Sequence, residues 1–367
     1  MQKHEISRVI SMIMVVAVVM TILIGCSSNA SDAASSAPAN TPPSAAQSNT
    51  PAPAAEPAAN TSPITVVWYP NESSNTHEEI RAEVARLIEQ ATGRKAENKT
   101  TTDYTIAIES IASGSADIAM AMGAVGYIEA QGRNPQVGVL FVNSDKNWSL
   151  DEAKYFSWIC VNAADADQYK SGDTYSIDNI KGKKMSFVSN SSTSGFRVPT
   201  SGIISHFASD NLDEDMLIEG GPFFNEVYFG GSHQGSAINL ITGIADAAAY
   251  CDTELDNYVR LKEGVENTVG AVYEIREGAD APFDVHAGKD FLVIACTPVF
   301  NGPNAYNPQN LSEAEIQAIR DLFTSEEVAS NEIIFYDDTV EGAIGLFKKS
   351  ASYGYVLVDD SWYDPYR

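Results

Sequence analysis

The chain has 367 residues, and its formal net charge is −26 at pH 7. Such acidity argues against nucleic acid and against wide anionic membrane surfaces as partners, because their phosphates would be repelled. A small anion is still compatible with this charge, since a few N–H and O–H donors determine the field at a local site. The length is sufficient for two lobes once the N-terminal segments are set aside.

The N-terminus has the pattern of a secretory signal. Lys3 and Arg8 precede an apolar run over residues 9–24, and Gly25 and Cys26 follow it. A charged start, an apolar stretch and a small residue before the cleavage point are typical of such signals. The segment resembles a bacterial lipobox, which implies a signal peptide over residues 1–25. The alternative is a membrane-spanning helix, for which the apolar run is short.

The lipobox also implies that Cys26 is lipidated and begins a tether. Residues 26–62 consist mainly of Ser, Ala, Pro, Asn and Thr, without a large apolar side chain. Such a segment cannot bury a core, so we expect it to be disordered. Lipid anchor and tether together predict a folded body, from about residue 63, that works outside the cell and is held at its membrane.

Three cysteines follow the tether, namely Cys160, Cys251 and Cys296. An odd number at wide spacing predicts neither a disulfide framework nor a metal site. Cys160 and Cys251 lie in apolar runs, so we expect both to pack as small hydrophobic residues. The sequence gives no sign of a cofactor.

Strand and helix patterns alternate through the body. Apolar β-prone runs predict strands over 64–68, 116–122, 137–142, 155–161, 185–188, 227–229, 245–250, 269–275 and 291–296. Helical periodicity predicts helices over 76–93, 103–111, 235–242, 312–323 and 340–348. Thr76 with Glu79, and Ser312 with Glu315, have the spacing of capping boxes. This alternation predicts an α/β fold on mostly parallel sheets.

Hydroxyl side chains gather where the strand over 185–188 turns into another helix. The residues are Ser192, Thr193 and Ser194, and Gly195 follows them. Unpaired N–H groups at a helix N-terminus favour an anion, and hydroxyls add the further donors that a tetrahedral oxyanion needs. The alternative is that Ser194 only caps the helix.

Several blocks together resemble the phosphonate/phosphite-binding proteins of ABC importers, a branch of the type 2 periplasmic binding proteins. The blocks, in the family's order, are 69–72, 102–104, 116–119, 123–127, 155–158, 192–199, 231–233 and 243–249. The resemblance implies a two-lobed fold with two hinge crossovers, near 157–162 and 250–253. Lobe 1 would contain residues 63–158 plus 253–367, and lobe 2 residues 159–252.

The resemblance also implies ligand-binding residues. The turn over 192–195 would hold the oxyanion, and Tyr104, Tyr155 and His233 would add donors. Relatives that take aminoalkylphosphonates surround the amine with two carboxylates, of which one matches Asp290. The other falls on Thr253, so it is missing or replaced by Asp252. Judged without the resemblance, His233 is better explained as a loop histidine that caps the following helix.

These observations predict a non-enzymatic receptor that captures phosphonate, phosphite or a related oxyanion and delivers it to an ABC permease and its ATPase. We expect a monomer. A secreted phosphoester or phosphonate hydrolase is the first alternative, although the chain has no Gly-x-Ser-x-Gly elbow and no evident base for the hydroxyl turn. The second is a receptor of the same fold for a sulfonate, a vitamin precursor or the ligand of a sensor kinase.

Overall fold

The computed structural model describes residues 60–221, 223–340 and 342–367. The predicted signal peptide, Cys26 and nearly all of the predicted tether lie outside the described residues. The chain from residue 58 onward forms one compact unit. Within the described ranges, no helix combines the length and the apolar character that crossing a membrane requires.

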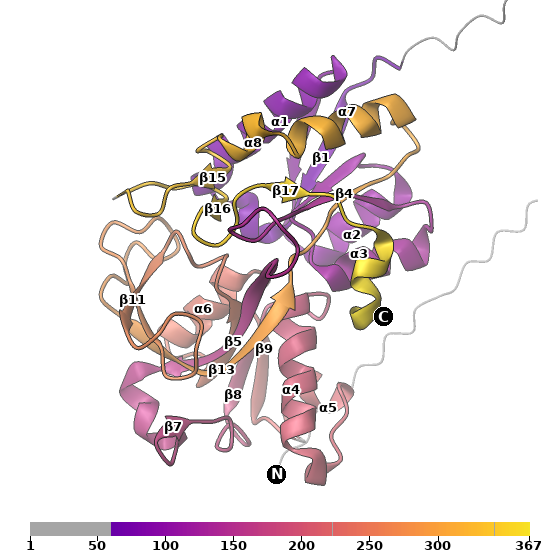
Figure 1. The fold of residues 1–367 in the computed structure, drawn as a ribbon. Coiled ribbons are helices and arrows are strands. Elements are labelled where there is room, and N and C mark those ends of the chain that lie inside the picture. The colour runs from indigo at the N-terminus through magenta and orange to yellow at the C-terminus, as the bar shows by residue number, and fades with distance from the viewer. Residues whose placement is uncertain (1–59, 222, 341) are drawn as a thin grey trace, which may run out of the picture. The chain divides into compact units, whose positions relative to one another are not determined.

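The first lobe is built on a six-stranded sheet. Its strands are β1 (Ile64–Trp68), β2 (Ala96–Thr100), β3 (Ile118–Met120), β4 (Gly138–Asn143), β14 (Asn304–Tyr306) and β17 (Tyr355–Val356). Its helices are α1 (Glu78–Thr92), α2 (Tyr104–Ser113), α3 (Ala124–Arg133), α7 (Glu313–Phe323) and α8 (Glu326–Ala329). The strand order is β17-β4-β14-β3-β1-β2. Figure 1 shows this lobe in indigo and yellow, with α1 and α7 along one side of it.

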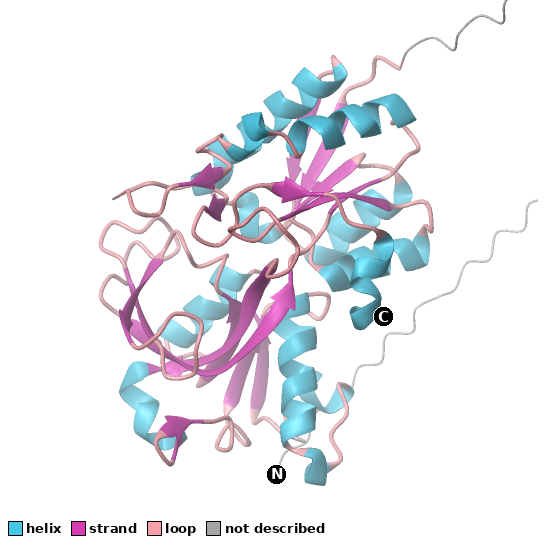
Figure 2. Cartoon of the chain, viewed as in Figure 1, coloured by secondary structure: helices cyan, strands magenta, loops and turns pink. Residues whose placement is uncertain are grey.

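Alternation along β1 explains how helices cover both faces of this sheet. Val66 and Trp68 pack with the apolar faces of α1 and α7, whereas Val67 packs with α2 and α3. Successive side chains of a strand point to opposite faces, so a strand that is apolar throughout is buried on both. Figure 2 shows helices on either side of the strands.

The second lobe is built on a seven-stranded sheet in the order β11-β12-β13-β5-β10-β8-β9. Its strands are β5 (Lys154–Asn162), β8 (Lys184–Phe187), β9 (Glu226–Phe229), β10 (Ala247–Cys251), β11 (Val259–Glu263), β12 (Val272–Ile275) and β13 (Asp290–Phe300). Its helices are α4 (Val198–His206), α5 (Asp215–Ile218) and α6 (His233–Ile241). A two-stranded sheet of β6 (Lys170–Ser171) and β7 (Thr174–Tyr175) is added to this lobe. Another, of β15 (Phe335–Tyr336) and β16 (Phe347–Lys348), packs against the core of the first lobe.

The α/β fold with two lobes is confirmed, but the predicted lobe boundaries are wrong for part of the chain. Strands β11 to β13, over residues 259–300, were expected in lobe 1 and belong to the sheet of lobe 2. The reason is the long antiparallel pairing of β13 with β5, which runs from Phe291 opposite Asn162 to Phe300 opposite Lys154. The crossovers are consequently residues 144–153, between β4 and β5, and 301–303, between β13 and β14.

The expectation of mostly parallel sheets is also wrong. Parallel pairing is confined to β2-β1-β3, β10-β8-β9 and the small β15–β16 pair. The other strand pairs among the described residues, including both partners of β5, are antiparallel. Lobe 2 is therefore built from long antiparallel strands as well as from βαβ units.

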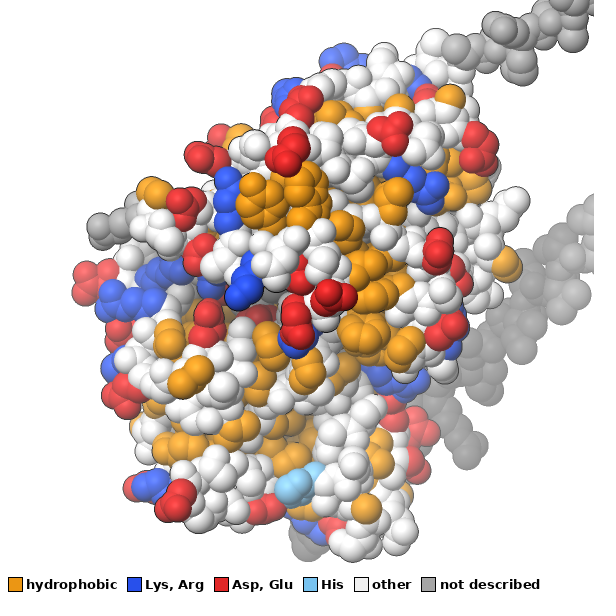
Figure 3. Space-filling view, viewed as in Figure 1, with side chains coloured by type: hydrophobic (Ala, Val, Ile, Leu, Met, Phe, Trp, Pro, Cys, Tyr) orange, Lys and Arg blue, Asp and Glu red, His pale blue; other side chains and the backbone are white. Residues whose placement is uncertain are grey.

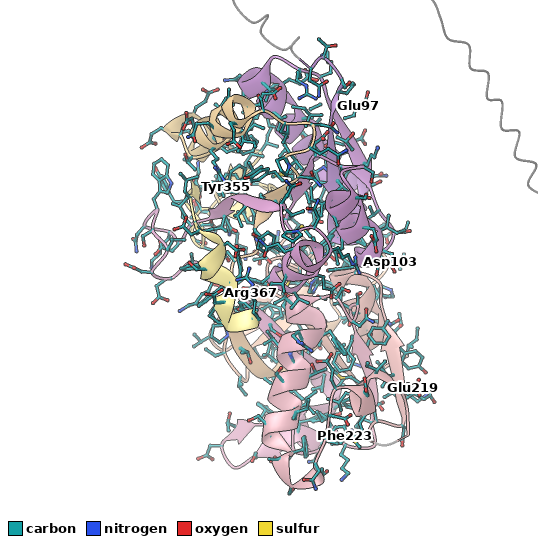
Figure 4. The ribbon with its side chains drawn as sticks, turned by 90° about the vertical axis from the view of Figure 1, so that its right-hand side faces the viewer. Glu97, Asp103, Glu219, Phe223, Tyr355 and Arg367 are labelled. Carbon is teal, nitrogen blue, oxygen red and sulfur yellow. The ribbon has the colours of Figure 1, made fainter. Side chains whose placement is uncertain are left out.

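Helix starts were predicted with mixed success. Asp103 caps α2 by accepting the N–H of Thr105 at 2.7 Å, and Figure 4 labels it at the start of that helix. The capping box of Ser312 and Glu315 is complete at α7. The first capping box is wrong, because α1 begins at Glu78 after a 3-10 turn over Asn75–His77. That turn carries the chain from β1 into the helix.

The predicted helix over 340–348 is not a helix. Its end forms β16, where Phe347 pairs with Phe335 of β15. Val340 and Ile344, which lie four residues apart in this range, are 56% and 52% exposed. Helical spacing of apolar residues was therefore not sufficient to predict a helix here, because these two side chains do not pack against a core.

Candidate ligand-binding site

A cleft lies between the two lobes and encloses about 600 Å³, part of it open to solvent. Lobe 1 contributes the segments that follow β1, β3 and β4, and lobe 2 contributes the segments that follow β8 and β10 and the start of α6. Residues of the short crossover also line it. Ligands of open α/β sheets bind outside the carboxyl ends of strands, where this cleft is.

The hydroxyl turn forms one wall of the cleft. Ser192 is the N-cap, and its hydroxyl oxygen accepts the N–H of Gly195 at 3.1 Å. A π-helical turn over Thr193–Arg197 follows and continues into α4. The prediction of a helix start is confirmed, but the capping residue is Ser192 and not Ser194. The first N–H groups of a helix have no acceptor within it, and all three hydroxyl residues at this helix start line the cleft.

Thr193 also joins the lobes. Its hydroxyl oxygen accepts the backbone N–H of Val125, in the first turn of α3, at 2.9 Å. Gly123 permits this approach, because a Cβ at that position would lie 2.8 Å from the Thr193 hydroxyl oxygen. Ser191 donates to Glu129 of α3 at 3.2 Å, so the start of the hydroxyl turn is held against lobe 1 at two points.

His233 faces the cleft from the start of α6. The cap of this helix is Ser232, whose hydroxyl accepts the N–H of Gly235, so the capping interpretation of His233 is wrong. The Nδ1 atom of His233 accepts the N–H of Cys251 at 3.0 Å. Burial lowers the pKa of His233 to about 3. The neutral ring therefore carries its proton on Nε2, which is the nitrogen left to donate to an anion.

The two tyrosines named by the resemblance, Tyr104 and Tyr155, line the cleft. The Tyr104 phenol, buried at the start of α2, lies 2.8 Å from the side-chain amide of Asn71. Tyr155, near the start of β5, lies beside Ser194 in the cleft lining. Burial raises the pKa of both phenols well above the usual value, so both keep the proton that a donor needs.

Gly195, Asp252 and Asp290 lie outside the cleft lining. A Cβ at Gly195 would lie 2.2 Å from a methyl group of Val188, so glycine is needed there for packing. Asp252 is buried beside the cleft, where it accepts the N–H of Phe156 at 2.8 Å and the side-chain amide of Asn267 at 3.1 Å. Asp290 begins β13 and pairs with Lys262 at 2.6 Å.

Several lining residues were missed from the sequence. Asn143 ends β4, Asn301 begins the short crossover, and Asn304 begins β14. The only feature of the sequence that pointed to Asn143 was its position after a predicted strand. Asn301 and Asn304 were missed because the crossovers were predicted in the wrong places. Glu254 lines the cleft as well. No Lys or Arg is among the described residues that line it. Within those ranges, no group of three or more His, Cys, Asp or Glu side chains is arranged to hold a metal ion.

Arg197, the charged residue that follows the hydroxyl turn, lies at the surface. Arg197 is half exposed and pairs with Glu214 before α5, so it is turned away from the cleft. On the face shown in Figure 3, basic and acidic side chains are interspersed.

Cys160, Cys251 and Cys296 are free, and the first two are buried as expected.

Comparison with known proteins decides the family. Residues 66–363 match the model of the family described as ABC transporter, phosphonate, periplasmic substrate-binding protein. The chain belongs to this family. Its members are transport receptors and not enzymes, which confirms the prediction of a non-enzymatic protein.

A curated relative is the phosphate-import protein PhnD of Mycolicibacterium smegmatis, 28% identical over 216 residues. The match covers 56% of this chain and 61% of that protein, which is less than two thirds of its length.

Solved structures in the same family show the fold. A binding protein component of an ABC phosphonate transporter from Pseudomonas aeruginosa has a TM-score of 0.58 at 18% identity, over 83% of this chain and 84% of that one. PhnD1 of Prochlorococcus marinus, in complex with methylphosphonate, has a TM-score of 0.56 at 13% identity, over 83% and 95%. The two-lobed architecture of this chain is therefore that of the family's binding proteins.

Proposed function

We propose that the protein captures a tetrahedral phosphorus oxyanion between its lobes and delivers it to an ABC permease and ATPase. Phosphonate, phosphite and phosphate are the ligand class. The observation that carries this proposal is the meeting of the Ser192–Thr193–Ser194 turn and neutral His233 in one cleft. Membership of the phosphonate-binding family supports it.

The donors of the cleft suit capture without chemistry. Backbone N–H groups, hydroxyls, phenols and a neutral imidazole can bind an anion without a cationic side chain. Enclosure between the lobes excludes water, which strengthens each hydrogen bond to a charged oxygen. While the lobes are in contact, caps and cross-lobe contacts hold these donors in place, which lowers the cost of ordering them around an anion.

The location of the protein is part of the proposal. A signal peptide over residues 1–25 and lipidation of Cys26 would hold a monomer at the outer face of the cell membrane. Residues 26–62 would then act as a tether that lets the folded unit reach the permease. Metabolic labelling with a fatty acid, in wild type and in Cys26→Ala, tests this arrangement. An equally labelled variant would remove the lipid anchor from the proposal.

Titration calorimetry tests the function. We expect saturable heat with at least one of phosphite, phosphate, methylphosphonate and 2-aminoethylphosphonate, and none with sulfate at the same concentration. A folded sample that gives no heat with any phosphorus oxyanion would overturn the proposal. The variant Ser201→Ala is a matched control, since Ser201 is an exposed serine of α4 outside the cleft lining.

A further inference from the structure

A second space adjoins the cleft between the lobes, and we call it the hinge chamber. It encloses about 850 Å³, part of it open to solvent. Lobe 1 contributes the end of β4 and the segment around β16, and lobe 2 contributes β5 and the segments that follow β10 and β11. Four residues line both spaces, namely Asn143, Thr253, Asn301 and Phe347. The cleft and the hinge chamber therefore meet at these four side chains.

The two spaces together are too large for a tetrahedral ion alone. Pockets of about 300–1,000 Å³ hold organic ligands that are far larger than a phosphorus atom with its oxygens. A phosphonate or a phosphate monoester has three charged oxygens on one side and a single substituent on the other. The hydroxyl turn and His233 line the cleft but not the hinge chamber. If they bind the oxygens, the chamber is left for the substituent.

Asn143 presents an open polar group where the two spaces meet. Its backbone carbonyl accepts the side-chain N–H of Asn301 at 2.8 Å. The side-chain amide of Asn143, by contrast, has no hydrogen-bond partner among the described residues, although the residue is only 8% exposed. A buried amide without a partner is costly, so it points to a polar group that arrives from outside.

Asn301 adds an acceptor beside this amide. Its Nδ2 atom donates to the carbonyl of Asn143, so the orientation of the amide is fixed and Oδ1 is the remaining polar atom. Within residues 60–221, 223–340 and 342–367, nothing donates to that oxygen. An amide that both donates and accepts, next to a free amide oxygen, matches hydroxyl groups, because each hydroxyl also donates and accepts.

The acidic side chains of the hinge chamber are already engaged. Asp252 accepts two N–H groups, at 2.8 and 3.1 Å. Asp256 pairs with Lys348 at 2.6 Å, and Glu266 lies 3.6 Å from the same ammonium nitrogen. These carboxylates therefore need no cation from a ligand.

Apolar rings complete the walls of the hinge chamber. Phe156 and Phe347 line it and are partly buried. The ring of Phe347 is held by stacking on Phe335, with 5.6 Å between the ring centroids. Ligand sites commonly combine such apolar walls with a few polar groups that fix orientation. Here the rings suit the C–H groups of a carbon chain, and the two amides suit its hydroxyls.

We propose that the hinge chamber binds an uncharged, hydroxyl-bearing substituent of the ligand, so that the ligand is a phosphonate or phosphate monoester of the polyol class. This inference rests on the proposed function and specifies its ligand. The charged oxygens bind at the hydroxyl turn and His233. The substituent passes Phe347, and its hydroxyls bind the amide of Asn143 and the Oδ1 atom of Asn301.

Calorimetry with matched ligands tests the inference on the full chain. One pair is methyl phosphate and glycerol 3-phosphate, and the other is methylphosphonate and 2,3-dihydroxypropylphosphonate. We expect the hydroxyl-bearing member of at least one pair to bind at least about tenfold more tightly, as two added neutral hydrogen bonds allow. No gain in either pair would overturn the inference. Tighter binding of 2-aminoethylphosphonate than of both hydroxyl-bearing ligands would also overturn it, because the site would then select a cation.

Variants connect this preference to the hinge chamber. Asn143→Ala removes no internal hydrogen bond of the side chain, and it should lower the affinity ratio within the preferred pair at least about fivefold. Phe347→Trp narrows the junction and should lower the same ratio. Asn225→Ala is the control, since Asn225 is an exposed asparagine of lobe 2 outside both linings.

Two outcomes separate this inference from the proposed function. An unchanged ratio in both Asn143→Ala and Phe347→Trp would overturn the role of the hinge chamber while leaving oxyanion capture intact. Wild type that binds none of these phosphorus ligands would instead defeat the proposed function.

Discussion

The hydroxyl oxygen of Thr193, in lobe 2, caps helix α3 of lobe 1 by accepting the N–H of Val125 at 2.9 Å. Gly123 is the N-cap residue of α3 and has no side chain with which to do so. The first N–H groups of a helix need acceptors from outside the helix. The two lobes therefore share a helix cap, which is present only while they are in contact.

Replacement of Thr193 by valine is expected to loosen this contact. Loss of a helix cap costs about 1 kcal/mol, so the amide of Val125 should exchange roughly fivefold faster in the ligand-free protein. Hydrogen exchange detected by NMR measures this rate. Thr193→Ser keeps the hydroxyl and should exchange like wild type. Equal rates in the valine and serine variants would contradict a capping role.

Ser194→Ala is expected to weaken binding without unfolding the protein. The hydroxyl of Ser194 is lost, whereas its backbone carbonyl still accepts the Ser157 hydroxyl at 2.7 Å. An anion oxygen left without one donor costs about 1–3 kcal/mol. Titration with the best phosphorus oxyanion should show that loss in affinity. The same titration of Ser201→Ala should match wild type, and an unchanged affinity of Ser194→Ala would place the anion elsewhere.

His233 predicts a specific loss of stability in acid. Its folded pKa of about 3 lies below the value near 6.5 that histidine has in an unfolded chain. The unfolded state therefore binds more protons below about pH 6.5, so the free energy of unfolding falls as the pH is lowered toward about 3. Relative to His233→Asn, wild type should lose roughly 2–4 kcal/mol between about pH 7 and pH 4.

Urea unfolding at several pH values measures this difference. His77, whose pKa burial lowers to about 4, contributes equally to both proteins and cancels in the comparison. A pH-independent difference between wild type and His233→Asn would show that the imidazole is protonated in the folded protein. In the same variant, oxyanion affinity should fall because the Nε2 donor is gone.

Lys348 of β16 and Asp256 of the segment after β10 form an ion pair of 2.6 Å between the lobes. The side chains are 17% and 20% exposed. Lys348→Met should weaken ligand binding by roughly 3- to 30-fold, since an unpaired, partly buried carboxylate opposes contact between the lobes. The effect should grow with pH, because the pKa of Asp256, raised by burial to about 6, leaves it charged at higher pH.

Lys181→Met is the matched control for this variant. Lys181 pairs with Asp210 within lobe 2, and its side chain is 55% exposed. Surface pairs of this kind contribute little, so affinity should not change. A loss in Lys181→Met equal to that in Lys348→Met would show that the lobe contact does not depend on this ion pair.

Local signals in the sequence predicted much of the fold and the centre of the site. Asp103 and Ser312 were recognised as caps because capping depends on neighbours two or three residues away. The hydroxyl turn was recognised for the same reason. His233 and the tyrosines required the family resemblance, since nothing local distinguishes a ligand histidine from a capping one.

Long-range pairing accounts for what could not be predicted. One of the two partners of β13 is β5, more than a hundred residues earlier in the chain, and no local pattern shows which distant strand a strand will pair with. Asp252 was a reasonable candidate from its position near Thr253, yet its carboxylate is turned to Phe156 and Asn267.

The short crossover has a kinetic consequence. Asn301 donates to the carbonyl of Asn143 at 2.8 Å and accepts the Tyr363 hydroxyl at 3.1 Å, and a Cβ at Gly302 would lie 2.0 Å from the carbonyl oxygen of Met122. Asn301 and Gly302 also line the cleft. Separation of the lobes must rotate backbone bonds in a segment that lines the cleft. The residence time of a bound ligand will therefore depend on the torsional stiffness of residues 301–303, even between ligands of equal affinity.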